Sequence, residues 1–237
     1  MAININEVFG WSATCISIIL HFSPIINYLK LCKGQISYNE TPNLKVLVNY
    51  ITSINWLIYG YLLRNKYIFF CNLFCSFLSI ICVFTFLLFL AKLKLLKAFL
   101  FTMTLLVYTV INYLVFAELI NNKEIIGYVC VILSIFLLIN PFLIMKKVIR
   151  YRNYKYIPIK IYTLNLIGSI CWIIYGFMII NFNLIIPNLI ELVVSLILMF
   201  IWNLFKKRKP IVEDVANLSI NITNIKRNKP ENQVSVV

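Results

Sequence analysis

The chain has 237 residues, of which 62% are apolar and only 13% are charged. A water-soluble domain carries about 25% charged residues, so this composition excludes an ordinary soluble domain and, over most of the length, a disordered chain. The net charge of +14 would suggest a nucleic-acid partner in a soluble protein, but the location of the basic residues gives a different explanation.

Seven segments are predicted to be membrane-spanning helices, because a spanning helix needs about 20 mostly apolar residues. In chain order they are Val8–Leu31, Leu44–Leu63, Tyr67–Ala91, Ala98–Ala117, Ile125–Met145, Ile157–Ile180 and Leu184–Phe205. The bilayer core offers the backbone no water, so helices are expected rather than strands. The polar tail that follows, starting with the basic run Lys206–Lys209, is predicted to be disordered. The expected fold class is all-α and integral to the membrane.

Basic residues gather on one side of the predicted membrane. Of the 22 lysines and arginines, all but Arg64, Lys66 and Lys123 fall after the first, third and fifth spans or in the tail. The positive-inside rule therefore predicts an N-terminus outside the cell and a cytosolic C-terminus. A cytosolic face near anionic lipid also explains the net charge, with the bilayer as the partner and no nucleic acid. The plasma membrane is favoured over an internal membrane.

The chain repeats itself at a spacing of about 116 residues, which indicates an internal duplication. Trp56–Gly60 recurs as Trp172–Gly176, and further pairs are Asn72 with Asn188, Pro42 with Pro158, Pro24 with Pro141 and Gly10 with Gly127. An offset of four spans preserves orientation, so two parallel three-helix bundles are predicted, with the fourth span between them. Parallel repeats occur in transporters whose substrate site lies between the halves. The predicted division is 1–92, the linker helix 93–122, the second bundle 123–206 and the tail 207–237.

This plan of three helices, a linker helix and three helices resembles the SWEET family of sugar uniporters. The resemblance covers residues 8–205 and is strongest between Gly127 and Trp202. The matching stretches are Ser23-Pro24, Trp56–Gly60, Asn72, Asn140-Pro141, Val148-Ile149, Ile157-Pro158, Cys171–Gly176 and Ile186-Pro187-Asn188. The resemblance implies passive, bidirectional transport of a mono- or disaccharide by alternating access between the two repeats.

Two pairs of residues are the candidate sugar site. By resemblance, Asn72 and Asn188 match paired asparagines that contact the sugar, and Trp56 and Trp172 match the walls of the pocket. An asparagine amide offers two donors and two acceptor lone pairs, which suits a polyol, while an indole offers a flat apolar face. The alternatives are that the asparagines cross-link helices and that the tryptophans belong to the interfacial aromatic belt.

Four prolines match a set of helix prolines in the family, which implies hinges for alternating access: Pro24, Pro42, Pro141 and Pro158. A proline inside a helix removes one backbone hydrogen bond and kinks the helix. Pro42 and Pro158 are alternatively ordinary residues near a helix start. Lys45 occupies the place at which the family's first half has its second proline, and Pro42 lies about one turn earlier.

A gate and a candidate proton-sensitive group complete the site. Tyr59 resembles the family's outer-gate tyrosine, and Asn181 stands where its partner is commonly aspartate; the alternative for Tyr59 is a lipid-interface tyrosine. Glu191 lies one turn after Asn188, where the family generally has glycine, and a carboxyl group at that depth is expected to be neutral or paired. It is either a proton-sensitive group at the site or a hydrogen-bonding link between helices. His21 is interpreted first as a packing residue.

The sequence contains no phosphate-binding glycine loop, metal-ligand cluster or nucleophile motif, so no enzyme activity, catalytic residue, metal or cofactor is expected. The first rival function is a PQ-loop-type or proton-coupled exporter of small solutes. Those exporters carry Pro-Gln where this chain has Pro24-Ile25 and Pro141-Phe142. The second rival is a seven-helix receptor, which has no need of the repeat. A passive sugar uniporter is the leading hypothesis, and assembly into a homo-oligomer stays open.

Overall fold

The structure is a computed structural model that describes residues 5–33, 43–93 and 123–208. It also describes five single positions, Leu95, Leu96, Phe99, Met103 and Tyr108. Pro42, most of the fourth predicted span and nearly all of the predicted tail lie outside the described residues. The described elements are all helical, without a strand among them.

Six of the predicted spans correspond to helices in the described residues. The elements are α1 (Ile5–Cys32), α2 (Asn43–Leu62), α3 (Lys66–Leu93), α5 (Lys123–Leu137), α6 (Ile139–Tyr151), the short 3-10 turn η2 (Tyr154–Tyr156), α7 (Ile159–Met178) and α8 (Phe182–Lys206). The fifth span is built from two consecutive helices, α5 and α6. Five segments are long and apolar enough to cross a membrane: Ile5–Ile26, Lys66–Leu88, Lys123–Tyr151, Ile159–Met178 and Phe182–Lys206.

The helix α2 is not among those five segments, because it carries more polar residues. Thr52, Ser53 and Asn55 are buried, so this polar face is turned into the protein. Asn55 donates a hydrogen bond to the hydroxyl of Tyr108, which belongs to the fourth predicted span. The low hydropathy of α2 therefore reflects its contacts with other helices, and its 20 residues are still about 30 Å long.

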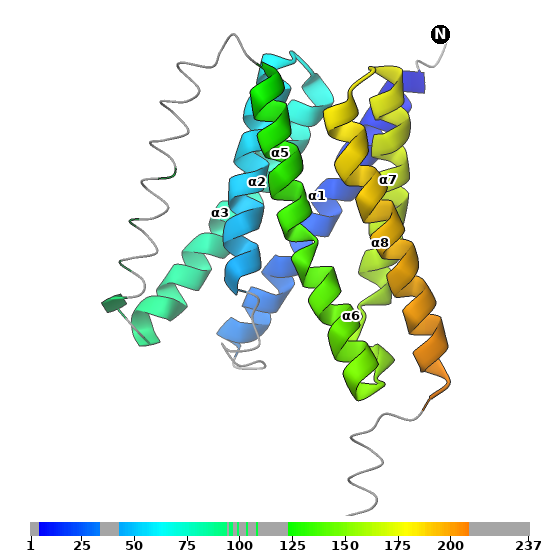
Figure 1. Ribbon diagram of the computed structural model, residues 1–237. Coiled ribbons are helices and arrows are strands. Elements are labelled where there is room, and N and C mark those ends of the chain that lie inside the picture. Colours follow the sequence, from blue (N-terminus) through cyan, green and yellow to red (C-terminus); the bar gives the residue numbers. More distant parts are fainter. Residues whose placement is uncertain are drawn as a thin grey trace, which may run out of the picture.

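The helices form two groups with the same internal order (Figure 1). In the first group α3 packs against α1 and α2, and in the second α8 packs against α7 and α5. The groups meet where α1 contacts α7 and where α2 contacts α5. Figure 1 shows that α1 and α5 begin at the same end of the molecule as the α2–α3 and α7–α8 turns. We call this the N-terminal end, and the opposite end, where the lysines and arginines gather, the basic end.

The two turns at the N-terminal end have the same backbone geometry. Arg64 and Ile180, which are 116 residues apart, have φ values of 53° and 51°. In each turn the following asparagine donates its backbone N–H to the carbonyl of a glycine five residues earlier, at 2.9 Å. These bonds join Asn65 to Gly60 and Asn181 to Gly176. This pattern is a Schellman motif, which ends a helix by turning one residue into the left-handed region.

A glycine lets the helices of each hairpin approach closely. A Cβ atom at Gly60 would lie 2.7 Å from the backbone nitrogen of Phe69 in α3. The equivalent Gly176 would place its Cβ 2.7 Å from Cγ1 of Ile185 in α8. Both distances are shorter than a real Cβ contact, so a larger residue at either position requires the neighbouring atoms to shift.

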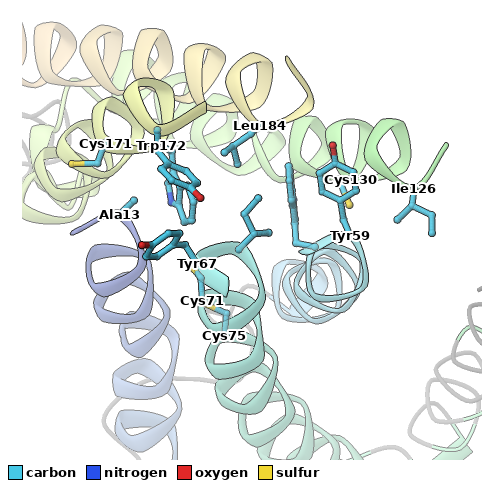
Figure 2. Packing of buried hydrophobic residues seen from close by; sticks show 13 residues of the cluster. Ala13, Tyr59, Tyr67, Cys71, Cys75, Ile126, Cys130, Cys171, Trp172 and Leu184 are labelled. Carbon is cyan, nitrogen blue, oxygen red and sulfur yellow. The ribbon is translucent and has the colours of Figure 1, made fainter. Parts of the chain in front are cut away.

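Both groups contribute to the buried core of the N-terminal half (Figure 2). This shared cluster contains Ala13, Trp56, Tyr59, Tyr67, Ile68, Cys71, Cys75, Ile126, Cys130, Cys171, Trp172, Tyr175 and Leu184. A second cluster lies at the basic end and draws its buried residues from the second group alone. It contains Leu138, Met145, Val148, Ile157, Tyr162, Val194, Leu198 and Ile201. The two groups are therefore packed together at the N-terminal end.

Candidate functional site

Two tyrosine–asparagine contacts cross between the groups at the N-terminal end. The Tyr59 hydroxyl of α2 accepts a hydrogen bond from Asn181 Nδ2 at 2.9 Å and lies 3.2 Å from its Oδ1. The Tyr175 hydroxyl of α7 accepts one from Asn65 Nδ2 at 2.7 Å. The four residues form two pairs at the repeat offset, so each group supplies one tyrosine and one asparagine. The sequence analysis selected Tyr59 and Asn181 but missed their counterparts, which the 116-residue offset was sufficient to find.

Each of these asparagines also caps the helix that it begins. Asn65 Oδ1 accepts hydrogen bonds from the backbone N–H groups of Tyr67 and Ile68, at 3.1 and 3.2 Å. Asn181 Oδ1 accepts one from Leu184 N at 3.0 Å. A capping side chain satisfies a backbone donor that has no partner within the helix. The amide nitrogen of each asparagine is thus left to reach the opposite tyrosine from a fixed position.

A third asparagine joins the contact around Tyr59. Asn183 Nδ2 donates to the Tyr59 hydroxyl at 3.2 Å and lies 3.5 Å from Oε2 of Glu124 on α5. Gly127 permits this arrangement, because a Cβ there would overlap the Asn183 amide nitrogen and lie 3.0 Å from Cε2 of Tyr59. The Tyr59 side chain, only 1% exposed, is therefore held by two asparagines at the start of α8. This burial does not fit the lipid-interface alternative.

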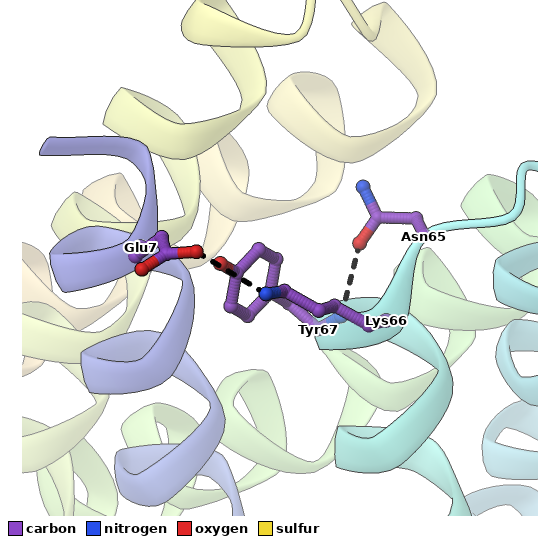
Figure 3. A network of polar contacts seen from close by, with 4 residues as sticks. All are labelled: Glu7, Asn65, Lys66 and Tyr67. Atoms are coloured by element: carbon purple, nitrogen blue, oxygen red, sulfur yellow. Dashed lines mark hydrogen bonds and ion pairs between the residues drawn. The ribbon is translucent and has the colours of Figure 1, made fainter. Parts of the chain in front are cut away.

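An ion pair supports the same end of the first group (Figure 3). Lys66 Nζ at the start of α3 lies 3.3 Å from Oε1 of Glu7 in α1. Both side chains are exposed, so the pair adds little to stability. Figure 3 also shows Asn65 beside the ion pair, where its Oδ1 accepts a hydrogen bond from the backbone N–H of Tyr67. The ion pair and the cap together fix where α3 begins relative to α1.

The two candidate tryptophans make equivalent contacts between the groups. Trp56 Nε1 of α2 donates to Ser134 Oγ of α5 at 3.0 Å, and Trp172 Nε1 of α7 donates to Ser17 Oγ of α1 at 2.9 Å. Both indoles are 8% exposed, which excludes a position in the interfacial belt. Ser17 and Ser134 are themselves 117 residues apart, and the sequence analysis did not select them. Since each indole N–H already has a partner, only the ring faces remain to contact a ligand.

Aromatic contacts connect each tryptophan to the tyrosine one turn away. The ring centroids of Trp56 and Tyr59 are 5.6 Å apart and those of Trp172 and Tyr175 are 6.0 Å apart, both edge to face. Tyr67 also meets Tyr175 edge to face, at 5.2 Å. Such pairs contribute about 0.5–1.5 kcal/mol beyond their buried area. The aromatic rings thus pack on the basic-end side of the tyrosine–asparagine contacts.

Of the two candidate sugar-binding asparagines, Asn188 lies one helical turn beyond Leu184 of this shared cluster, toward the basic end, and Asn72 lies on α3 between Cys71 and Cys75 of the same cluster. Asn72 Nδ2 donates to the Ile68 carbonyl at 2.8 Å, and Asn188 Nδ2 donates to the Leu184 carbonyl at 2.7 Å. Both side chains are half-buried and have the same orientation along their helices. Neither amide bridges to another helix among the described contacts. Each amide therefore has a second N–H and a carbonyl oxygen that are not used in these intrahelical bonds.

The four candidate prolines fall in different environments. Pro24 lies inside the continuous helix α1. Pro141 lies in the first turn of α6, and because it has no N–H to donate to Leu137, the helix is interrupted between α5 and α6. Pro158 is the N-cap residue of α7 and so precedes the helix rather than bending it. Pro42 is outside the described residues.

Glu191 lies half-buried on α8, one turn beyond Asn188 toward the basic end. It interacts electrostatically with Tyr162, a buried residue of α7. The carboxyl group therefore lies between α7 and α8 rather than in the shared cluster. The equivalent residue of the first group is Cys75, which is fully buried in that cluster.

A small polar cleft lies between α1, α2 and α3 and contains His21. Its walls are His21, Pro24, Asn49, Ser79 and Cys82. The His21 ring donates from Nδ1 to the Ser17 carbonyl at 2.9 Å, in agreement with a packing role. In the second group the positions equivalent to His21 and Cys82 are Leu138 and Leu198, which belong to the packed basic-end cluster. The two repeats thus differ most toward the basic end.

The chemistry available at this site is binding through neutral hydrogen bonds and ring faces. In the described part of the chain, no group of three or more His, Cys, Asp or Glu side chains is placed to hold a metal ion. The polar groups that lie between the two helical groups are amides, hydroxyls and indoles, with the Glu124 carboxylate at the edge. Such groups recognise hydroxylated, uncharged ligands.

Comparison with known proteins gives independent information on this arrangement. A family model described as "Sugar efflux transporter for intercellular exchange" matches residues 7–94 and 124–210, which correspond to the two repeats. Among solved structures, the one described as "The 3.7 A resolution structure of a eukaryotic SWEET transporter" matches with a TM-score of 0.76. The match covers 86% of this chain and 98% of that chain at 14% sequence identity. No curated protein matches the chain. The predicted seven-helix fold class is confirmed.

Proposed function

This chain belongs to the SWEET family of sugar efflux transporters, and from that premise we propose that it is a passive, bidirectional sugar transporter. The two repeats would alternate between a conformation closed at the N-terminal end and one closed at the basic end. A passive transporter needs no second energy source, because the sugar gradient alone sets the direction of flux.

The observation that carries this proposal is the doubled set of polar contacts between the groups. Two tyrosine–asparagine contacts and two tryptophan–serine bonds link the groups, in pairs related by the repeat. Each contact is a neutral hydrogen bond, worth a net 0.5–1.5 kcal/mol, so a few such bonds hold one end closed without locking it. The conformation described here is accordingly the one closed at the N-terminal end. Breaking these bonds and packing the basic end would give the other conformation.

We propose that the sugar binds at the edge of the shared cluster, between Asn72 and Asn188. Each amide offers an N–H and a carbonyl oxygen, so the two amides together would form hydrogen bonds with hydroxyl groups on opposite sides of the sugar ring. The ring faces of Trp56 and Trp172 would then contact the C–H surfaces of the sugar. The hydrogen bonds to Ser134 and Ser17 hold both indoles in place, so less side-chain entropy is lost when the sugar binds.

Rigid groups that alternate need positions at which helices bend. Pro24 and Pro141 are the proposed hinges, since each lies within a helical segment and removes one backbone hydrogen bond. Pro158 would act differently, as the fixed start of α7. Pro42 keeps the hinge role that the resemblance implies, as a proposal.

The proposed topology places the N-terminal end outside the cell and the basic end in the cytosol, in the plasma membrane. Tyr59 and Asn181, with Tyr175 and Asn65, would then form the outer gate. In this orientation the described conformation is closed to the outside. Sugar is the proposed substrate, and no cofactor is required.

The test is uptake and efflux of radiolabelled mono- and disaccharides in a cell that lacks its own sugar transporters. We expect uptake that saturates, equals efflux at matched concentrations and is accelerated by unlabelled sugar on the opposite side. Protein that reaches the plasma membrane but moves none of these sugars in either direction would refute the proposed function.

A proton-coupled exporter is the second candidate, and Glu191 is the observation that favours it. We expect Glu191 to stay protonated as a hydrogen-bond donor, because the bilayer strongly disfavours a bare carboxylate. On that view Glu191→Gln transports nearly normally, whereas Glu191→Leu reduces flux or alters sugar preference. The measurement is uptake across external pH, with and without a protonophore. Uphill accumulation that a protonophore abolishes and Glu191→Gln removes would identify a symporter instead.

A further inference from the structure

We propose that the basic end of the second group binds anionic phospholipid headgroups through a rim of cations held over aromatic rings. Three elements, α6, η2 and α8, meet at this rim. Its defining residues are Lys147 with Tyr156, Arg150 with Tyr151 and Lys206 with Trp202. This surface is separate from the proposed sugar site.

Aromatic rings hold these cations, and no ion pair with an acidic side chain is found for Lys147, Arg150 or Lys206 among the described residues. Lys147 Nζ lies 4.6 Å from the centroid of the Tyr156 ring, and Lys206 Nζ lies 4.6 Å from that of Trp202. Both distances are within the range of a favourable cation–π interaction. A ring leaves the N–H donors of the ammonium group directed outward, so the charge stays available to an anion.

The rim has the layering of a membrane interface. The lysines and arginines are exposed, the rings beside them are half-buried, and neighbouring apolar residues such as Ile201 and Val148 are buried in the basic-end cluster. An edge-to-face contact between Tyr154 and Trp202, at 6.0 Å, ties η2 to α8 and makes one continuous surface. Tryptophan and tyrosine favour the level of the headgroups, which places these cations at the phosphates.

The rim has a high density of positive charge, so the expected partner is an anion of high charge density. Between residues 139 and 160, and again between 200 and 208, the chain has nine basic residues and no acidic one. They are Lys146, Lys147, Arg150, Arg152, Lys155, Lys160, Lys206, Lys207 and Arg208. The tail beyond residue 208 has four basic and three acidic residues, so its net charge is not that of an anionic occupant. An anionic lipid leaflet supplies the required charge at the required depth.

The test uses the purified full chain in phosphatidylcholine nanodiscs and a short-chain phosphatidylinositol bisphosphate as the probe. We compare K147Q/K206Q with the matched double change K30Q/K33Q, which removes two cations from the same end of the first group. A cation near the surface is worth about a factor of five, so the first variant should bind about 30-fold more weakly and the second within about twofold of the wild type. The charge-conserving K147R/K206R should restore binding.

Two further measurements test whether binding needs the aromatic rings as well as the charges, and whether it needs the whole lipid rather than its headgroup alone. Trp202→Leu keeps every charge but removes one ring, and we expect binding several-fold weaker than wild type. Inositol bisphosphate without its acyl chains should bind much more weakly than the lipid. The proposal is overturned if K30Q/K33Q loses as much affinity as K147Q/K206Q, if Trp202→Leu binds normally, or if the free headgroup binds as tightly as the lipid. Sugar flux is not measured, so this outcome is independent of the proposed function.

Discussion

Asparagine recurs in the contacts between the two repeats and in the proposed sugar site, because one amide side chain both donates and accepts hydrogen bonds. Asn65 and Asn181 use the oxygen to cap a helix and the nitrogen to reach a tyrosine of the other group. Asn72 and Asn188 use one N–H on their own helix, and the proposal assigns the second N–H and the carbonyl oxygen of each to the sugar. None of these positions needs a charge, which suits a protein that moves an uncharged solute through a bilayer.

Replacing either ligand-facing asparagine is expected to abolish sugar flux without loss of the protein. Asn72→Ala and Asn188→Ala each leave sugar hydroxyls unpartnered, at about 1–3 kcal/mol per unmade hydrogen bond. The lost amide bond runs only to a backbone carbonyl that is already part of a helix, so folding should survive. The measurement is labelled-sugar uptake, normalised to surface expression. Normal flux by either variant would assign that asparagine a structural role.

The tyrosine–asparagine contacts are testable by double-mutant cycles. For Tyr175→Phe with Asn65→Ala we expect a coupling of about 0.5–1.5 kcal/mol, since both changes remove the same hydrogen bond. The cycle cancels the separate cost of losing the Asn65 cap. The matched control combines Tyr175→Phe with Asn181→Ala, whose side chains share no hydrogen bond. The readout is the free energy of unfolding in detergent, and equal coupling in the two cycles would contradict the crossed arrangement.

Residue-level predictions from the sequence relied on side chains that both repeats share. The tryptophan and asparagine pairs were found in this way. Ser17 and Ser134 were missed because serine is common in helices and gives no signal on its own; only the structure shows that they accept the indole N–H groups. Tyr175 and Asn65 were missed although the offset pairs them with Tyr59 and Asn181.

At the scale of elements, the hairpins α2–α3 and α7–α8 repeat one design with different neighbours. Both end in a Schellman turn, and both carry a glycine at the closest helix approach. Gly60 faces backbone atoms of α3, which move only if the helices separate. Gly176 faces a side-chain atom instead, Cγ1 of Ile185, which can shift without separating the helix backbones.

This difference predicts unequal effects of the same substitution. Gly60→Ala should destabilise the protein by about 1–3 kcal/mol, because the added methyl group forces α2 away from α3. Gly176→Ala should be close to neutral, since a small side-chain shift is offset by about 1 kcal/mol of helix propensity. The measurement is thermal unfolding of the two variants in the same detergent. Equal losses would mean that both hairpins are equally rigid.

Among the described residues, hydropathy predicted the helix ends to within about three residues, except that the fifth span continues to Tyr151, and it did not predict interruptions. The chain from Ile125 to Met145 reads as one apolar segment, and the structure divides it near Leu138. The break arises because Pro141 leaves the Leu137 carbonyl without its helical donor. Composition alone cannot say whether a proline bends a helix or breaks it, since neighbouring helices decide that.

At the scale of the whole molecule, the repeat predicted two equivalent groups but not how they pack. Nothing in the sequence indicated that α3 and α8 lie in the middle of their groups, or that the groups join through α1 with α7 and α2 with α5. Hydropathy reports burial in lipid or protein alike, so it carries no information on which helices are neighbours. Those pairings determine which side chains meet in the candidate site.

The orientation of the molecule is predicted by the distribution of its basic residues. An epitope placed after Val237 should be accessible to antibody only after the cells are permeabilised. An epitope placed before Met1 should be accessible on intact cells. Labelling of the C-terminal epitope on intact cells would reverse the topology, and with it the assignment of the tyrosine–asparagine contacts to an outer gate.

The crossed contacts have a consequence for assembly. Each half of the chain carries both members of every contact, a tyrosine with an asparagine and a tryptophan with a serine. The surface that one half presents is therefore chemically self-complementary, which is the property of an isologous dimer interface. The interface between the halves therefore has the chemistry of a symmetric homodimer interface. Because the halves are covalently connected, they are always present one to one, whereas two separate chains would have to associate to reach that ratio.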